Sequence, residues 1–248
     1  SDAASGHTST AAAAAAASAA ATTATSASSS SSSSSSAGSF GNSADAVGFA
    51  LGDGATRWAG ACAALAMADG TFKVAGSADG ARTTPACVAF MTSNAEVLVG
   101  AAAARMRHTR SAVTIHGAAA LLGEPYGSSA MNALADSHRG GATLAADDEG
   151  RAAFKAHGVV HTAVELVARQ LQVLLADTKR VANRDVPVAV LAVPAVAKAD
   201  DAMQGSIYEP TVGVSTAYHA AASLAGLRRV ELLPSAVAAL IGAAANTD

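Results

Sequence analysis

Apolar residues between Ala46 and Phe90 fall into short runs that are separated by turns containing glycine. Runs of this length, split by Asp-Gly and other Gly-rich turns, are typical of antiparallel strands. The pattern predicts strands over 46–52 and 58–67, a third after Asp69-Gly70, a fourth over 86–90 and a fifth over 96–100. The turn Gly52-Asp53-Gly54 joins the first two strands, and a glycine turn of this kind can lay a phosphate chain against bare backbone N–H groups.

The second half of the chain has a different period. Apolar residues recur every three or four positions between Val160 and Leu175, which predicts a helix over 159–180. A nearly continuous apolar stretch over 186–193 predicts a strand covered on both faces. A strand over 228–233 and a helix with Pro234 in its first turn complete the pattern. Residues 127–150, rich in Gly, Ala and Asp, show no clear period and are interpreted as loop.

The beginning of the chain has a composition of its own. Residues 1–41 are almost all Ala, Ser and Thr, and an unbroken run of serine extends from Ser28 to Ser36. Without large apolar side chains a segment cannot offset the entropy of ordering, so we interpret 1–43 as a disordered tail and 44–248 as the folded unit. A transit peptide is excluded because the tail contains neither Arg nor Lys.

Charge and cysteine content exclude several classes of protein. A net charge of −3, with 14% charged residues, indicates no direct binding to nucleic acid or to a membrane surface. No charge-free apolar run reaches the roughly 18 residues of a membrane-spanning helix. Cys62 and Cys87 lie in predicted strands without C-x-x-C spacing, which favours buried free thiols in a reducing, cytoplasmic location.

Other candidate residues favour structural roles. His157 and His161 are spaced like two zinc ligands on a helix, but Gly158 stands where the zinc motif needs a glutamate. We therefore predict no metal site and place this pair at the start of the long helix. Thr83 and Thr84 are interpreted as residues that fix the entry into the fourth strand.

Two motifs resemble the opening of the nucleotide-binding domain of the heat-shock-70 chaperones, in the actin and sugar-kinase superfamily. That family opens with a sequence of the type V-G-I-D-L-G-T-T and continues with G-x-R-T-T-P-S-x-V-A-F. This chain has Val47-Gly48-Phe49-Ala50-Leu51-Gly52-Asp53-Gly54 and then Ala81-Arg82-Thr83-Thr84-Pro85-Ala86-Cys87-Val88-Ala89-Phe90. The resemblance extends over about residues 45–246 and corresponds to the first lobe of that domain.

The resemblance implies a fold. It implies a ribonuclease-H-like α/β lobe of the actin and heat-shock-70 ATPase type, with a mixed sheet of about five strands and helices on both faces. It also implies a helix over 111–123 and a helix that ends near Gly226, which is well placed as a left-handed cap.

The resemblance also assigns the catalytic positions. Phosphoryl transfer depends on positioned charges, and the family uses an Asp beside the metal, a Lys near the γ-phosphate and a Glu. Those positions hold Ala50, Ala104 and Leu233 here, so we predict no catalytic residue and no ATP hydrolysis. ATP or ADP with magnesium is then expected to bind weakly, through the backbone of the first turn, or not at all. The residues of that turn are Gly52, Asp53, Gly54 and Ala55.

The implied function is that of a heat-shock-70-like chaperone or co-chaperone module with a degenerate ATPase lobe. Such a module is expected to assist nascent or unfolded polypeptides through a J-domain protein or a ribosome-associated complex, as an atypical subclass of the family does. Two alternatives stay open: an active ATP-dependent chaperone whose loops align in another register, and a non-enzymatic scaffold.

Overall fold

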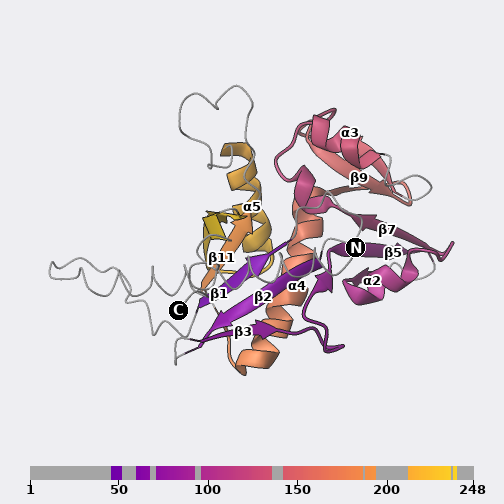
Figure 1. The fold of residues 1–248 in the computed structure, drawn as a ribbon. Helices are drawn as coiled ribbons and strands as arrows, with labels where there is room; N and C mark the ends of the chain where they lie inside the picture. The colour runs from indigo at the N-terminus through magenta and orange to yellow at the C-terminus, as the bar shows by residue number, and fades with distance from the viewer. Residues whose placement is uncertain are drawn as a thin grey trace.

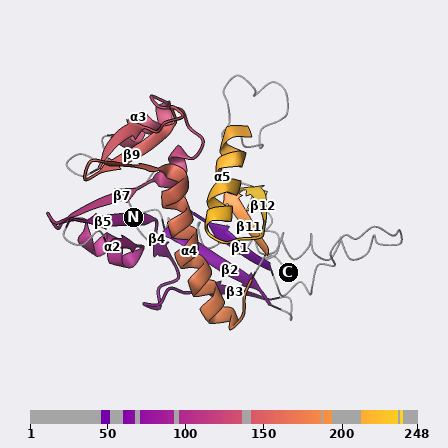
Figure 2. The ribbon, with the colours of Figure 1, turned by 180° about the vertical axis from the view of Figure 1, so that it is seen from behind.

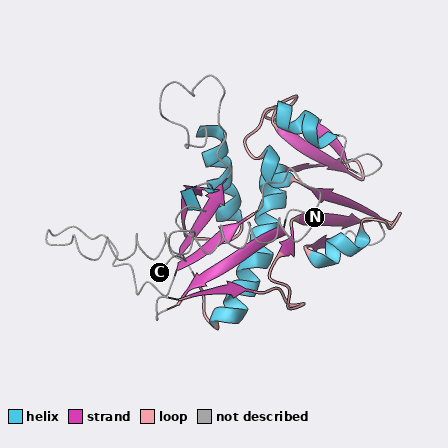
Figure 3. Cartoon of the chain, viewed as in Figure 1, coloured by secondary structure: helices cyan, strands magenta, loops and turns pink. Residues whose placement is uncertain are grey.

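The structure is a computed structural model that describes residues 46–51, 60–67, 71–92, 96–135, 142–186, 188–193, 212–235 and 237–238. Figure 3 colours these residues by secondary structure. The predicted tail, the turn Gly52-Asp53-Gly54, the first residues of the predicted second strand and the turn Asp69-Gly70 lie outside the described residues.

The central sheet has the strand order β12-β11-β1-β2-β3 (Figure 1). β1 (Ala46–Ala50) is parallel to β11 (Val188–Val193), which is parallel to β12 (Arg229–Pro234). β2 (Gly60–Ala66) is antiparallel to both β1 and β3 (Phe72–Ala75). The two-residue β4 (Thr84–Pro85) pairs with the start of β2. The predicted mixed α/β lobe with five main strands is thereby confirmed.

Two helices cover one face of this sheet, α4 (Ala163–Ala182) and α5 (Val212–Leu224), as Figure 2 shows. Of the helices expected on both faces, these two confirm the expectation for one face. Alternate strand residues such as Val47, Phe49 and Leu191 point into the core with the apolar faces of both helices. Leu166, Leu171 and Leu174 supply the core face of α4. Burial of side chains like these, at roughly 2 kcal/mol each, is the main source of the stability of the lobe.

Two smaller antiparallel sheets lie on the side of α4 that is away from α5 (Figures 1 and 3). The first contains β6 (Val97–Val99), β5 (Cys87–Met91) and β7 (Ala112–His116), with α2 (Ala101–Met106) packed along β5. The second contains β10 (Val159–Thr162), β9 (Ala152–Ala156) and β8 (Thr143–Ala146). A short 3-10 helix, η2 (Ala118–Leu121), and α3 (Ser129–Ala135) connect the two.

The prediction of a helix over 111–123 is wrong. Residues 112–116 form β7, and only the four residues of η2 are helical. The β-branched side chains of Val113, Thr114 and Ile115 suit a strand that pairs with β5. Gly117, with a φ of 72°, then ends the strand.

The interpretation of 127–150 as loop is also wrong, because α3 and β8 lie within it. Met131 and Leu134 are buried on α3, and Leu144 of β8 lies opposite Phe154 of β9. These elements are held by tertiary packing, and the apolar residues of 127–150 show little periodic signal for them.

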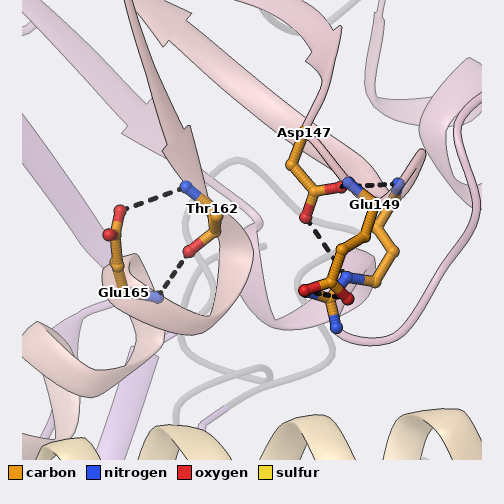
Figure 4. A network of polar contacts seen from close by, with 5 residues as sticks. Asp147, Glu149, Thr162 and Glu165 are labelled. Carbon is orange, nitrogen blue, oxygen red and sulfur yellow. Dashed lines mark hydrogen bonds and ion pairs between the residues drawn. The ribbon is translucent and has the colours of Figure 1, made fainter.

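The long helix begins later than predicted. Residues 159–162 form β10, and a capping box at Thr162 starts α4 (Figure 4). The Thr162 hydroxyl accepts from Glu165 N at 3.2 Å, and Glu165 Oε2 accepts from Thr162 N at 3.2 Å. His157 and His161 therefore lie on the β9–β10 hairpin rather than at a helix start. These two reciprocal hydrogen bonds define where α4 begins, which the period of the apolar residues alone does not.

The ends of α5 and β12 test two further predictions. Gly226, with a φ of 92°, caps α5: its N–H donates to Ser223 O and that of Leu227 to Ala222 O, each at 3.0 Å. This Schellman pattern confirms the predicted cap. Pro234 is instead the last residue of β12, and helical residues begin at Ser235. A proline without an N–H donor is tolerated at the end of an edge strand.

Candidate functional site

Two of the three expected catalytic positions lie on one line across the central sheet. Ala50 on β1 is opposite Ala192 on β11, and Ala192 is opposite Leu233 on β12. On its other side Ala50 is opposite Cys62 of β2. We call Leu233, Ala192, Ala50 and Cys62 the row. It crosses the carboxyl ends of three parallel strands, which is where open α/β sheets bind their ligands.

The side chains of the row are three aliphatic groups and the thiol of Cys62. Ala50, Ala192 and Cys62 are 4%, 5% and 1% exposed, and Leu233 is half-buried. No carboxylate, amide or hydroxyl side chain belongs to it. Magnesium prefers oxygen ligands in octahedral geometry, so the side chains of the row do not fit a magnesium–nucleotide complex.

The third position, Ala104, lies on α2. Its N–H donates to Gly100 O at 2.9 Å in the first turn of the helix. Ala104 packs with Leu98 and Met106 on a small apolar cluster formed by Cys87, Ala89 and Ala103. A lysine in the same family position presents an ammonium group, whereas this methyl group contributes only to packing.

Close contacts occur at three glycines of the lobe. A Cβ on Gly60 would lie 2.9 Å from Thr83 Cβ, and one on Gly100 would lie 2.6 Å from Thr84 Cγ2. A Cβ on Gly123 would lie 2.6 Å from the carbonyl oxygen of Gly213, at the start of α5. We call these three contacts the frame. The first two contacts hold Thr83 and Thr84 between the start of β2 and the start of α2, so the structural role predicted for these threonines agrees with their positions. The third contact joins Gly123 to the start of α5.

Comparison with known proteins identifies the origin of this arrangement. The family model described as Hsp70 protein matches residues 47–204, which is more than half of the chain. The chain belongs to the heat-shock-70 family. A search among curated proteins finds no match. As a heat-shock-70 family member the protein is related to chaperones in general, and the mixed sheet with its helices is the lobe expected for that family.

Ionised groups in the described part of this heat-shock-70 lobe lie around the row rather than in it. On α2, Arg105 Nη1 lies 3.6 Å from Asp79 Oδ2, and both side chains are exposed. On β12, Arg229 Nη2 and Glu231 Oε1 are 3.5 Å apart at the surface. Exposed pairs of this kind contribute at most about 1 kcal/mol and are screened by salt.

The two cysteines of this heat-shock-70 member are buried thiols that form no disulfide, as predicted. Burial raises the pKa of Cys87 to about 12, while the positive charge of Arg107 opposes that shift. Its Sγ donates to the carbonyl oxygen of Gly100 at 3.4 Å. A thiol with so high a pKa is not a nucleophile at neutral pH, so Cys87 supports the fold.

The structure does not bring all the singled-out residues together. Gly52, Asp53, Gly54 and Ala55 lie outside the described residues, so the weak nucleotide-binding turn stays a prediction. His157 Nε2 lies 3.1 Å from Phe90 O, and the His161 ring stacks on Phe90 with centroids 4.0 Å apart, so both histidines join β5 to the β9–β10 hairpin. Across the described ranges no three His, Cys, Asp or Glu residues are grouped as metal ligands, and no described helix is long and apolar enough to span a membrane.

Proposed function

We propose that this lobe is a degenerate heat-shock-70 module that assists protein folding without hydrolysing ATP itself. The observation that supports the proposal is the row. Its two family catalytic positions, Ala50 and Leu233, carry aliphatic groups at the carboxyl ends of neighbouring strands, and Ala192 lies between them. Catalysis of phosphoryl transfer requires charges that stabilise the metal ion and the transferring phosphoryl group.

The packing of Ala104 supports the same conclusion. A single missing charge can be replaced by a neighbouring group, but Ala104 adjoins an apolar cluster of Cys87, Ala89 and Ala103. The three positions have therefore lost charge on two separate elements, the central sheet and α2. We propose that residual nucleotide affinity comes only from the backbone of residues 52–55, and that a protein partner supplies the regulated step.

The proposed partner is a J-domain protein or a ribosome-associated complex, through which the lobe assists a second, active chaperone in the cytoplasm. This proposal extends the general chaperone relationship of the family to a specific mode of action. Unfolded or nascent polypeptides are the proposed clients.

Single-turnover hydrolysis of ATP by the full chain, with magnesium, tests the catalytic part of the proposal. We expect hydrolysis at the rate of the buffer alone, and calorimetric titration with magnesium ATP should show weak binding or none. Hydrolysis at the rate of an active heat-shock-70 chaperone, measured in parallel, would refute the proposal. Affinity purification of the full chain should recover a J-domain protein or ribosomal proteins, and recovery of neither would favour a scaffold.

A further inference from the structure

β3 is an edge strand of the central sheet, with β2 on one side and no described strand on the other (Figure 1). The hydrogen bond from Met67 N to Thr71 O, at 2.9 Å, fixes which residues of β3 face β2. Bonded and non-bonded pairs alternate along an antiparallel ladder. Lys73 therefore bonds to β2, whereas Phe72 and Val74 direct their N–H and C=O groups outward. No hydrogen bond from the described part of the chain reaches these outward groups.

The side chains of β3 alternate between two environments. Phe72 and Val74 lie on the face opposite α4, beside Ala66 and Ala64 of β2. Phe72 is 38% exposed, and Val74 is half-buried. Lys73 lies on the other face and is exposed, and it forms no ion pair with the described residues. The outer edge of β3 thus has a basic residue between two apolar ones.

The opposite edge of the sheet, β12, has a different composition. It ends in Pro234, which has no N–H to donate, and it carries the charged pair of Arg229 and Glu231. Proline and charged side chains are the usual protection of an edge strand against pairing with another chain. On β3 a single lysine lies beside an exposed aromatic ring. This lysine selects an incoming strand that has an acidic residue opposite it.

A second copy of this chain does not suit the edge. Two-fold symmetry makes the two β3 strands antiparallel, and the register that uses all the outward groups sets Phe72 opposite Val74 of the second copy. Lys73 then faces its own equivalent, and like charges directly opposite each other destabilise a strand pair. Four residues of strand span only about 13 Å, which is short for the roughly 1,000 Å² that a stable interface between folded proteins buries. A short extended segment fits this length.

We propose that the outer edge of β3 binds an extended segment of another protein, antiparallel to β3, in which an acidic residue lies between two apolar residues. The apolar residues exchange backbone hydrogen bonds with Phe72 and Val74. The acidic side chain lies opposite Lys73, in a non-bonded pair where side chains approach closely. Unfolded polypeptides expose segments of this kind. The inference does not depend on the proposed function, because strand addition requires neither nucleotide nor the row.

Binding of a fluorescent peptide, Thr-Thr-Val-Glu-Val-Thr-Thr, to the full chain tests the backbone contacts. Methylation of both valine nitrogens removes the N–H groups that donate to Phe72 and Val74, so binding should weaken by about tenfold or more. Methylation of the glutamate nitrogen is the matched control, because that N–H points away from β3, and it should leave the affinity unchanged. Equal losses for the two methylated peptides would refute strand addition.

The substitution Lys73→Glu tests the selected charge. It should weaken binding of the glutamate peptide by about fivefold and make the chain prefer the same peptide with lysine in place of glutamate. Lys155→Glu, the same change at an exposed lysine on β9, should leave both affinities unchanged. If the unaltered chain binds both peptides equally well, the assigned charge is wrong.

Amide hydrogen exchange of the full chain, followed by NMR, locates the contact. With peptide bound, the amide protons of Phe72 and Val74 should exchange more slowly, while that of Lys73, already bonded to β2, should not change. Protection elsewhere without protection at Phe72 and Val74 would refute the site. Peptide binding that weakens as the chain concentration rises would show that a second copy occupies the edge, and would overturn the assigned occupant.

Discussion

The frame and the row place different demands on their residues. At Gly60, Gly100 and Gly123 neighbouring atoms occupy the space of a Cβ: threonine side chains at the first two, and the backbone of Gly213 and Val214 at Gly123. These positions therefore disfavour a side chain because of close packing. In the row, Ala50, Ala192 and Leu233 are held by strand pairing that any apolar side chain of suitable size permits. A fold can therefore keep the shape of a site after the groups that performed its chemistry have been replaced.

The contrast between close packing and charge also distinguishes evidence for the fold from evidence for the activity. The family-model match over residues 47–204 shows membership of the heat-shock-70 family, and the strand order agrees with the lobe expected for it. The row concerns charge, and charge decides whether phosphoryl transfer is stabilised. The two properties are independent, so a match to the family supports the fold more directly than the activity.

The largest effect should come from the frame. Gly123→Ala places a Cβ 2.6 Å from Gly213 O and 2.7 Å from Val214 N, both backbone atoms, at a φ of 73°. We expect a loss of about 4 kcal/mol in the free energy of unfolding, from overpacking together with left-handed strain. Urea unfolding of the full chain measures it.

The matched control for this substitution is Gly80→Ala. Gly80 has a φ of 80° but no atom within 4 Å of a built Cβ. The substitution Gly80→Ala should lower the free energy of unfolding by about 1 to 2 kcal/mol, because it introduces left-handed strain without a close contact. Equal losses at Gly80 and Gly123 would mean that the contact with α5 is not close in solution.

A smaller but still large effect is expected in the row. Ala50→Asp restores the family residue, but it places a carboxylate at a position that is 4% exposed, next to Ala192 and Cys62. We expect a loss of about 3 kcal/mol at pH 7, because a buried charge without a partner is strongly unfavourable. Burial raises the pKa of such a carboxyl group in the folded state, so the loss should shrink as the pH is lowered toward 5.

The control for the row is Ala102→Asp, in the first turn of α2 and half-buried. A carboxylate near a helix N-terminus should change stability by less than about 1 kcal/mol. If Ala50→Asp is tolerated as well as the control, a cation that compensates it lies nearby, and the proposal of an uncharged row fails.

The accuracy of the sequence-based predictions differs between parts of the chain. The strands of the central sheet and the Gly226 cap were correct, because long apolar runs and a left-handed glycine carry local signals. The region from Ser111 to Thr162 was largely wrong. There α3, β8 and the short β9–β10 hairpin depend on strand pairing and packing that leave no clear apolar period, and the start of α4 depends on two hydrogen bonds made by the side chains of Thr162 and Glu165. The alignment of Ala50 with Leu233 required the strand register, which no local pattern contains.

The smallest effect should be the pH dependence of the joint between β5 and the β9–β10 hairpin, away from both the frame and the row. Burial lowers the pKa of His161 below its ordinary value of 6.5; Glu165 opposes this shift and Arg169 adds to it. The unfolded chain then binds more protons than the folded chain near pH 6. The contribution of His161 is therefore present above pH 6.5 and is lost as the pH falls through the folded pKa.

Thermal unfolding between pH 7.5 and 5.5 measures this contribution. His161→Gln should slightly flatten the dependence of the unfolding temperature on pH. The effect should be smaller than the losses expected for Gly123→Ala and Ala50→Asp, because His161 is only partly buried. His219→Gln, at an exposed position on α5, is the matched control and should leave the profile unchanged. A steeper profile for His161→Gln would contradict the sign, and would show that the stacked ring on Phe90 is favoured in its protonated form, as a cation above an aromatic face.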